Sequence, residues 1–103
     1  MGIDVAWVNE RHEPKQEVFD SRQCLTRLAS SEWPRSNTVC LRFVDVCGDA
    51  VFNQAQIPVL LAELRSTQIA QKDEQTKDHL VKVIRLVECA LDRTHTYIKF
   101  IGD

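Results

Sequence analysis

At 103 residues and with a formal net charge of -2, the chain has the length of one ordinary domain and can bury a core without disulfides or metal. Hydrophobic residues make up 44% of it and charged residues 27%, close to globular averages, so the composition favours neither a disordered nor a fibrous protein. Its basic residues are scattered, so we expect no nucleic-acid partner. No apolar run approaches the length of a membrane span and no secretory signal is present, so we expect a single cytoplasmic domain over residues 1–103, without a membrane partner.

The first third of the chain predicts two strands and a short helix. Apolar and polar residues alternate over residues 3–8, which is typical of a half-buried strand. A polar loop containing Pro14 follows, and residues 17–19 can add a short edge strand. Asp20 or Ser21 offers an N-cap for a helix over about residues 22–30.

The middle of the chain predicts a β-hairpin. Residues 38–45 alternate most clearly of all, with Val39, Leu41 and Phe43 on the side expected to face the helices. The segment 47–49 supplies a turn, and residues 50–53 can return as the second, antiparallel strand.

The last half predicts two helices and a final strand. Pro58 fits only a first helical turn, so one helix runs from about residues 56–58 to residue 70. A longer helix extends from about residue 73 or 76 to residue 93, and residues 96–101 alternate as a strand. The order predicts an α+β two-layer sandwich, a mainly antiparallel sheet with about three helices on one face. We expect five residues in its core: Leu41, Phe43, Leu64, Val87 and Phe100.

No nucleophile elbow, phosphate-binding loop, dinucleotide fingerprint or zinc-protease motif occurs, and we assign no catalytic residue and no cofactor. Four cysteines lack CxxC or metal-ligand spacing and are expected to be free thiols: Cys24, Cys40, Cys47 and Cys89. Asp45, Asp49 and Asp103 could attract a hard cation. Aspartates near turns more often bond to their own backbone, so no metal site is assigned.

Two groups of residues are candidates for binding. If residues 38–45 form a strand, Arg42 and Tyr97 share the open sheet face, and aromatic residues and arginine are enriched at protein interfaces. The second group surrounds the predicted turn and helix start, and comprises Asp45, Asp49, Asn53 and Gln56. A structural alternative remains open, in which Asp49 shapes the turn and Asn53 caps the helix.

Residues 40–64 resemble a set of short uncharacterised bacterial proteins. The shared pattern is Phe-x-Asp-x-x-Gly-Asp-x-x-Phe-Asn leading into a Gln-x-Pro helix, together with an ending of the type Phe-x-Gly-Asp, as in residues 100–103. The chain departs from that pattern at Val46-Cys47. The resemblance implies a bacterial origin and no particular reaction.

Three functions remain open at this stage. The first is a non-enzymatic module, immunity-like or regulatory, that binds an unidentified protein partner by surface complementarity. The second is a small hydrolase or metal-dependent activity built on Asp45, Asp49 and a histidine. The third is a self-associating structural protein that forms a homodimer.

Overall fold

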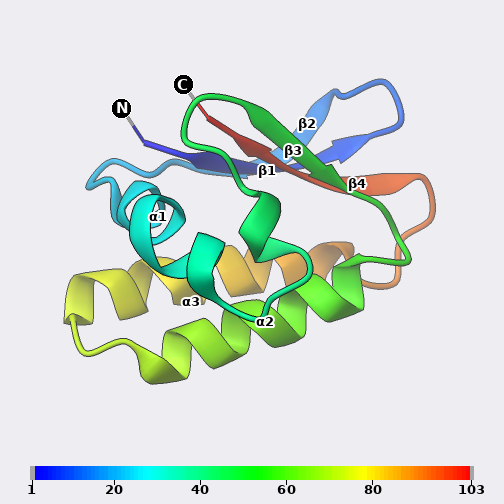
Figure 1. Ribbon diagram of the computed structural model, residues 1–103. Helices are drawn as coiled ribbons and strands as arrows, with labels where there is room; N and C mark the ends of the chain where they lie inside the picture. The colour runs from blue at the N-terminus through cyan, green and yellow to red at the C-terminus, as the bar shows by residue number, and fades with distance from the viewer. Residues whose placement is uncertain (1, 103) are drawn as a thin grey trace.

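A four-stranded antiparallel sheet forms one layer of the fold in the computed structural model, which describes residues 2–102 (Figure 1). The strands are β1 (Asp4–Asn9), β2 (Pro14–Val18), β3 (Asp49–Phe52) and β4 (Thr96–Ile101). Their order across the sheet is β2-β1-β4-β3, so the first and last strands of the chain lie side by side in its centre. All three pairings are antiparallel.

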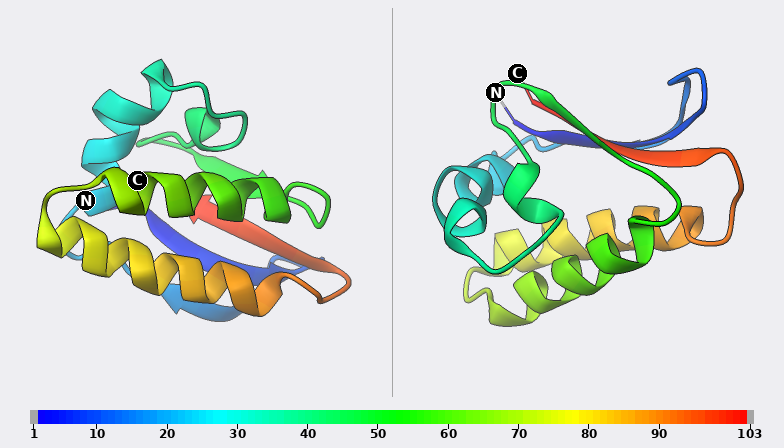
Figure 2. Two further views of the ribbon diagram at one scale, coloured as in Figure 1. Left: turned by 90° about the horizontal axis from the view of Figure 1, so that it is seen from below. Right: turned by 45° about the vertical axis from the view of Figure 1, so that its right-hand side comes forward.

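The second layer contains the helices, all on one face of the sheet (Figure 2). The α-helices are α1 (Cys24–Arg27), α2 (Ile57–Ala70) and α3 (Glu74–Ala90). Shorter turns accompany them: a π-helical turn η1 (Leu28–Glu32) and two 3-10 turns, η2 (Trp33–Arg35) and η3 (Leu41–Phe43). The predicted α+β two-layer architecture is therefore confirmed.

Local chemistry explains where the two long helices begin. Pro58 lies in the first turn of α2. Its lack of a backbone N–H costs nothing there, because N–H groups of the first turn have no partner within the helix. Asp73 is the N-cap of α3, and its Oδ2 accepts hydrogen bonds from the backbone N (3.2 Å) and Oγ1 (2.7 Å) of Thr76. These bonds lower the pKa of Asp73 below its usual value. Within residues 2–102, no helix has the length and apolar character needed to cross a membrane.

The predicted strand over residues 38–45 is wrong. Residues 38–45 contain the 3-10 turn η3. The predicted hairpin is therefore absent, and β3 pairs with β4. The carboxylate of Glu63 on α2 accepts three hydrogen bonds from its backbone, from the N–H groups of Val39 (2.6 Å), Cys40 (3.0 Å) and Leu41 (3.1 Å). Backbone N–H groups that bind this carboxylate cannot also donate to a neighbouring strand. The first N–H groups of a helical turn need such an outside acceptor, so the arrangement favours a turn over a strand.

One hydrophobic core fills the space between the layers. Four of the five predicted core residues are confirmed: Leu41, Leu64, Val87 and Phe100 are each at most 1% exposed. The fifth prediction is wrong, because Phe43 lies at the end of η3 with 67% of its surface exposed. Phe52 and Phe100 pack edge to face with ring centroids 5.7 Å apart, which joins β3 to β4 on the helix side of the sheet.

Candidate functional site

The two candidate aspartates lie on either side of the turn that leads into β3. Asp45 accepts a hydrogen bond at Oδ1 from the backbone N of Cys47 (2.9 Å), which shapes the turn. The turn packs against the end of β4, where Gly102 N donates to Gly48 O (2.9 Å). A side chain at position 102 would overlap the backbone oxygens of Asp45 and Gly48, so this close approach requires glycine there.

Asp49 faces the open side of the sheet beside a lysine of the neighbouring strand. Its Oδ2 lies 3.6 Å from Nζ of Lys99, and both side chains keep contact with solvent. An ion pair of this kind contributes at most about 1 kcal/mol to folding. The carboxylate of Asp49 is therefore available at the surface but is not isolated.

Asn53 and Gln56 bond to each other at the start of α2. Asn53 N donates to Gln56 Oε1 (2.9 Å), and Gln56 N donates to Asn53 Oδ1 (3.1 Å). This reciprocal arrangement has the logic of a capping box, in which two residues three positions apart satisfy each other's backbone donors. The geometry supports the structural alternative for this pair, and a binding role for them stays a prediction.

Arg42 and Tyr97 do not share a face of the sheet. Tyr97 lies on β4 in register with Val8, on the open face together with Lys99. Arg42 belongs to η3, which packs against α2 in the helical layer, and its guanidinium lies 5.9 Å from the ring centroid of Phe43. The predicted common face was wrong because it required residues 38–45 to be a strand.

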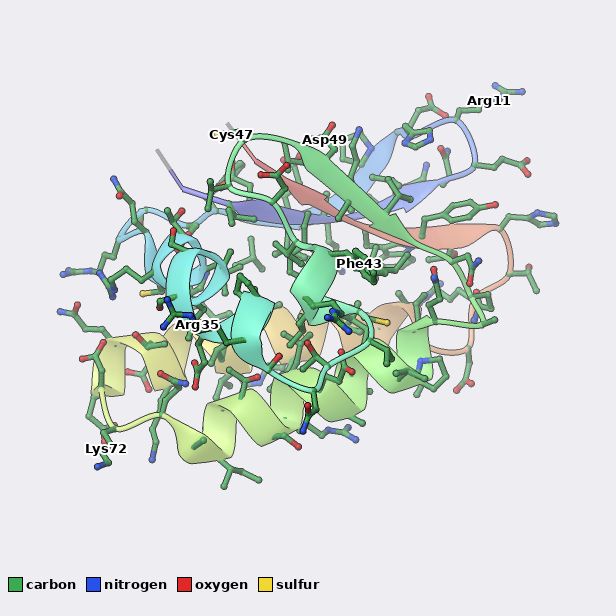
Figure 3. The ribbon with its side chains drawn as sticks, in the orientation of Figure 1. Arg11, Arg35, Phe43, Cys47, Asp49 and Lys72 are labelled. Carbon is green, nitrogen blue, oxygen red and sulfur yellow. The ribbon has the colours of Figure 1, made fainter. Side chains whose placement is uncertain are left out.

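An exposed apolar surface that the sequence did not predict surrounds η3. Val39 is 61% exposed, Phe43 67% and Val59 42%. Val59 lies one helical turn before Glu63, whose carboxylate binds the backbone of Val39, so these side chains come from adjoining segments. Figure 3 shows Phe43 projecting from η3 between β3 and α2. We call Val39, Arg42, Phe43 and Val59 the η3 patch.

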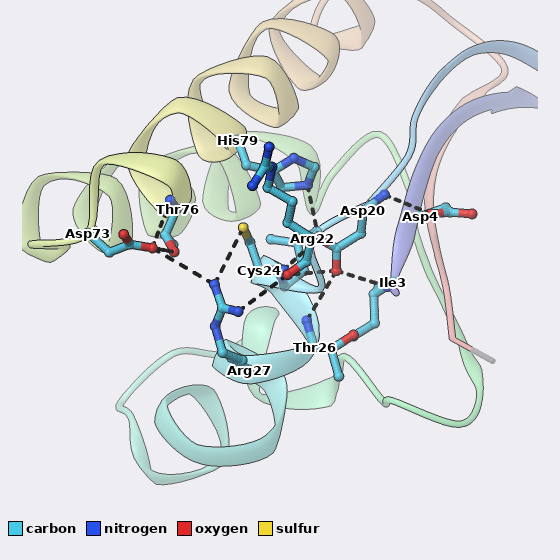
Figure 4. A network of polar contacts seen from close by, with 11 residues as sticks. Ile3, Asp4, Asp20, Arg22, Cys24, Thr26, Arg27, Asp73, Thr76 and His79 are labelled. Atoms are coloured by element: carbon cyan, nitrogen blue, oxygen red, sulfur yellow. Dashed lines mark hydrogen bonds and ion pairs between the residues drawn. The ribbon is translucent and has the colours of Figure 1, made fainter. Parts of the chain in front are cut away.

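A buried polar network around Asp20 forms a second cluster, between β1, α1 and α3 (Figure 4). Asp20 is 3% exposed, and its carboxylate accepts hydrogen bonds from four backbone N–H groups. The donors are Ile3 (3.1 Å), Cys24 (2.7 Å), Leu25 (3.1 Å) and Thr26 (3.3 Å). The side chain therefore connects the start of β1 to the first turn of α1. The predicted N-cap position is wrong, because α1 begins at Cys24 and its N-cap is Gln23, although the carboxylate of Asp20 binds the N–H groups of the first turn.

His79 of α3 joins the same network. Its Nε2 lies 3.5 Å from Asp20 Oδ1 and is buried without a hydrogen bond. Burial lowers the pKa of His79 below its usual value, and Lys82 adds to this, while the carboxylates of Asp20 and Asp4 oppose it. A small polar hollow of about 290 Å³ adjoins the ring and is lined in part by Arg22 and Lys82.

This burial makes stability depend on pH. The folded chain holds His79 neutral below the pH at which an unfolded histidine takes up its proton. The free energy of unfolding should therefore fall as the pH drops through about 6.5 and should level off below the lowered pKa of the folded state. Urea titrations between pH 7.5 and 5 measure this slope. The dependence of the free energy of unfolding on pH should become shallower in His79→Gln and stay unchanged in His12→Gln, which alters an exposed histidine. Equal slopes in the wild type and both variants would contradict the assignment of this dependence to His79.

Among residues 2–102, all four cysteines are free, and no three His, Cys, Asp or Glu side chains converge in a way that could hold a metal ion. Asp103, the third aspartate considered for a cation, lies outside the described residues. The thiol of Cys24 is buried and lies 3.7 Å from Nη2 of Arg27. Burial and the charge of Glu63 raise the pKa of Cys40, which works against a reactive thiolate there.

Comparison with known proteins returned no match: no family model, no curated protein and no solved structure is similar to this chain at a significant level.

Proposed function

We propose that the protein is a non-enzymatic binding module, of the immunity-like or regulatory kind, that recognises a protein partner through the η3 patch. The observation that carries this proposal is the exposure of Phe43 together with Val39 and Val59 around η3. Among the other aromatic side chains of residues 2–102, Phe19 is similarly exposed (63%), and the rest are buried or half-buried. Exposed aromatic side chains accompanied by arginine are the usual anchors of protein interfaces.

The patch is also held in place, which favours binding over random exposure. The backbone N–H groups of residues 39–41 donate three hydrogen bonds to the Glu63 carboxylate, which fixes this segment, and Leu41 anchors η3 in the core. Since a rigid surface loses little conformational entropy when a partner docks, this support increases the affinity that a few side chains can give. The partner that fits the patch presents an apolar pocket for Phe43 and an acidic or aromatic group beside Arg42.

A capture experiment tests the proposal. The tagged protein is incubated with a lysate of the cells that naturally produce it, and any stoichiometric partner is purified and titrated against the protein by calorimetry. Phe43→Ala should weaken binding at least about thirtyfold, as expected for loss of a central anchor worth 2 kcal/mol or more.

The matched control is Ile69→Ala, which removes another exposed apolar side chain, on the last turn of α2. It should leave the affinity unchanged. Equal binding by wild type, Phe43→Ala and Ile69→Ala would contradict the η3 patch as the binding surface. Thermal unfolding of each variant separates a loss of binding from a loss of fold.

A further inference from the structure

The free edge of β3 carries backbone groups without a partner in the sheet. Gly102 N donates to Gly48 O, and these two residues are the next pair in register after Asp49 and Ile101. Hydrogen-bonded and non-bonded pairs alternate along an antiparallel ladder. Ala50 and Phe52 are therefore the residues bonded to β4, whereas Asp49 and Val51 direct their N–H and C=O groups out of the sheet.

The β2 edge of the sheet has more features that block pairing with another chain than the β3 edge has. β2 begins with Pro14 and contains Lys15 and Glu17, and its register with β1 shifts between Trp7 and Val8. Proline, charged side chains and bulges are the devices that keep an edge from pairing with another chain. β3 reads Asp-Ala-Val-Phe, pairs in a regular register, and has one charge, which lies near Lys99.

From this asymmetry we propose that β3 accepts an extended peptide segment of the partner protein as a fifth, antiparallel strand. The inference rests on the proposed function and names the form in which the partner binds. The exposed N–H and C=O groups of Asp49 and Val51 fit an extended backbone, which is how strand addition gains affinity.

Side chains around the edge define which segment fits. Positions of the added strand opposite Ala50 and Phe52 point to the helical layer, where η3 lies between β3 and α2 and Phe43 is exposed (Figures 2 and 3), so apolar residues fit there. The position opposite Asp49 lies on the open face beside its carboxylate, so lysine or arginine fits there. From its N-terminal end, the antiparallel peptide should have an apolar residue opposite Phe52, a β-branched residue opposite Val51, an apolar residue opposite Ala50 and a basic residue opposite Asp49.

A second copy of this chain fits the edge less well. Two β3 strands related by a two-fold axis use the outward groups of both Asp49 and Val51 only in the register that places Asp49 of each chain opposite Val51 of the other. That register sets a carboxylate against an apolar side chain on the same face, twice. A peptide with a basic residue opposite Asp49 avoids both mismatches.

The test uses the blocked hexapeptide acetyl-Thr-Leu-Val-Leu-Lys-Thr-amide, titrated into the ¹⁵N-labelled full chain and followed by NMR. The amide signals of Asp49 and Val51 should shift with saturation. N-methylation of the peptide valine, which removes a hydrogen bond to β3, should weaken binding about tenfold or more. The same change on the following leucine, whose N–H points away from β3, should leave the affinity within about threefold.

Two variants of the protein complete the test. Val51→Pro removes the outward N–H without breaking a bond to β4, and should weaken peptide binding about tenfold or more. Val51→Thr keeps the N–H and the strand propensity, and should bind the peptide nearly as wild type. Thermal unfolding confirms that both variants keep the fold.

Several results would overturn the proposal. Absence of shifts at Asp49 and Val51, or equal losses from the two N-methylated peptides, would exclude strand addition. A dimer of the unliganded chain that Val51→Pro dissociates would assign the edge to a second copy instead. If Phe43→Ala weakens binding of the captured partner and Val51→Pro does not, the strand inference fails while the proposed function stands. If Val51→Pro weakens binding and Phe43→Ala does not, the η3 patch is contradicted and strand addition stands.

Discussion

Replacing Asp20 with alanine should lower the free energy of unfolding by about 3–5 kcal/mol, one of the two largest effects we expect from a single substitution in this chain. The carboxylate accepts four backbone hydrogen bonds inside the protein and lies 3.5 Å from His79. Removing the carboxylate leaves buried backbone N–H groups without an acceptor. Each buried N–H group that finds no new hydrogen-bond partner lowers the free energy of unfolding by about 1–3 kcal/mol. Urea unfolding followed by circular dichroism measures the change.

Two companion variants define the cause. Asp20→Asn keeps one acceptor oxygen and the size of the side chain, so its loss should be smaller than that of Asp20→Ala. Asp92→Ala, at an exposed aspartate after α3, should change stability by no more than about 0.5 kcal/mol. If Asp20→Ala unfolds at the same urea concentration as Asp92→Ala, the network does not hold the N-terminal half of the fold together.

The second large effect is expected for Phe100→Ala, which should cost about 3–5 kcal/mol. Phe100 is 1% exposed, lies on a central strand and packs edge to face against Phe52. The truncation removes apolar contacts from both layers and leaves a cavity that the surrounding side chains only partly fill. The measurement is the midpoint of denaturant unfolding, with the slope of the transition checked for constancy.

Phe43→Ala is the matched comparison, because it makes the same chemical change at a residue that is 67% exposed. Its cost should stay below about 0.5 kcal/mol. Similar losses in the two variants would mean that Phe43 is covered in solution, by the chain itself or by another copy.

The contrast between these two phenylalanines shows what periodicity can predict. Alternation of apolar residues located β1 and β4 correctly. Buried and half-buried residues alternate throughout β4, whereas β1 departs from this pattern because Ala6 and Val8 of its open face are also buried. The same alternation in residues 38–45 predicted a strand that does not exist. A 3-10 turn that buries Leu41 and exposes Val39 and Phe43 has no signature in apolar pattern alone.

Long-range chemistry explains the other differences. The carboxylate that starts η3 belongs to Glu63, twenty-two or more positions away from the donors it satisfies, and no local rule relates the two. Asp20 was expected as an N-cap from its position before a helix, but its bond to Ile3 and its closeness to His79 depend on the tertiary fold. The mutual capping of Asn53 and Gln56, by contrast, is local, and the helix start was predicted there.

The strand order has a consequence for the kinetics of folding. β4 lies between β1 and β3, and it consists of residues 96–101, so neither neighbour can complete its pairing until almost the whole described chain has been synthesised. Pairs between β1 and β4 range from Asn9 with Thr96 to Asp4 with Ile101, which are 87 and 97 residues apart, and such contacts give a high contact order, which slows folding compared with helical domains of this length. During synthesis, the nascent chain should lack the β1–β4 and β3–β4 pairings until residues 96–101 have left the ribosome, with the edges of β1 and β3 open to chaperones during that interval.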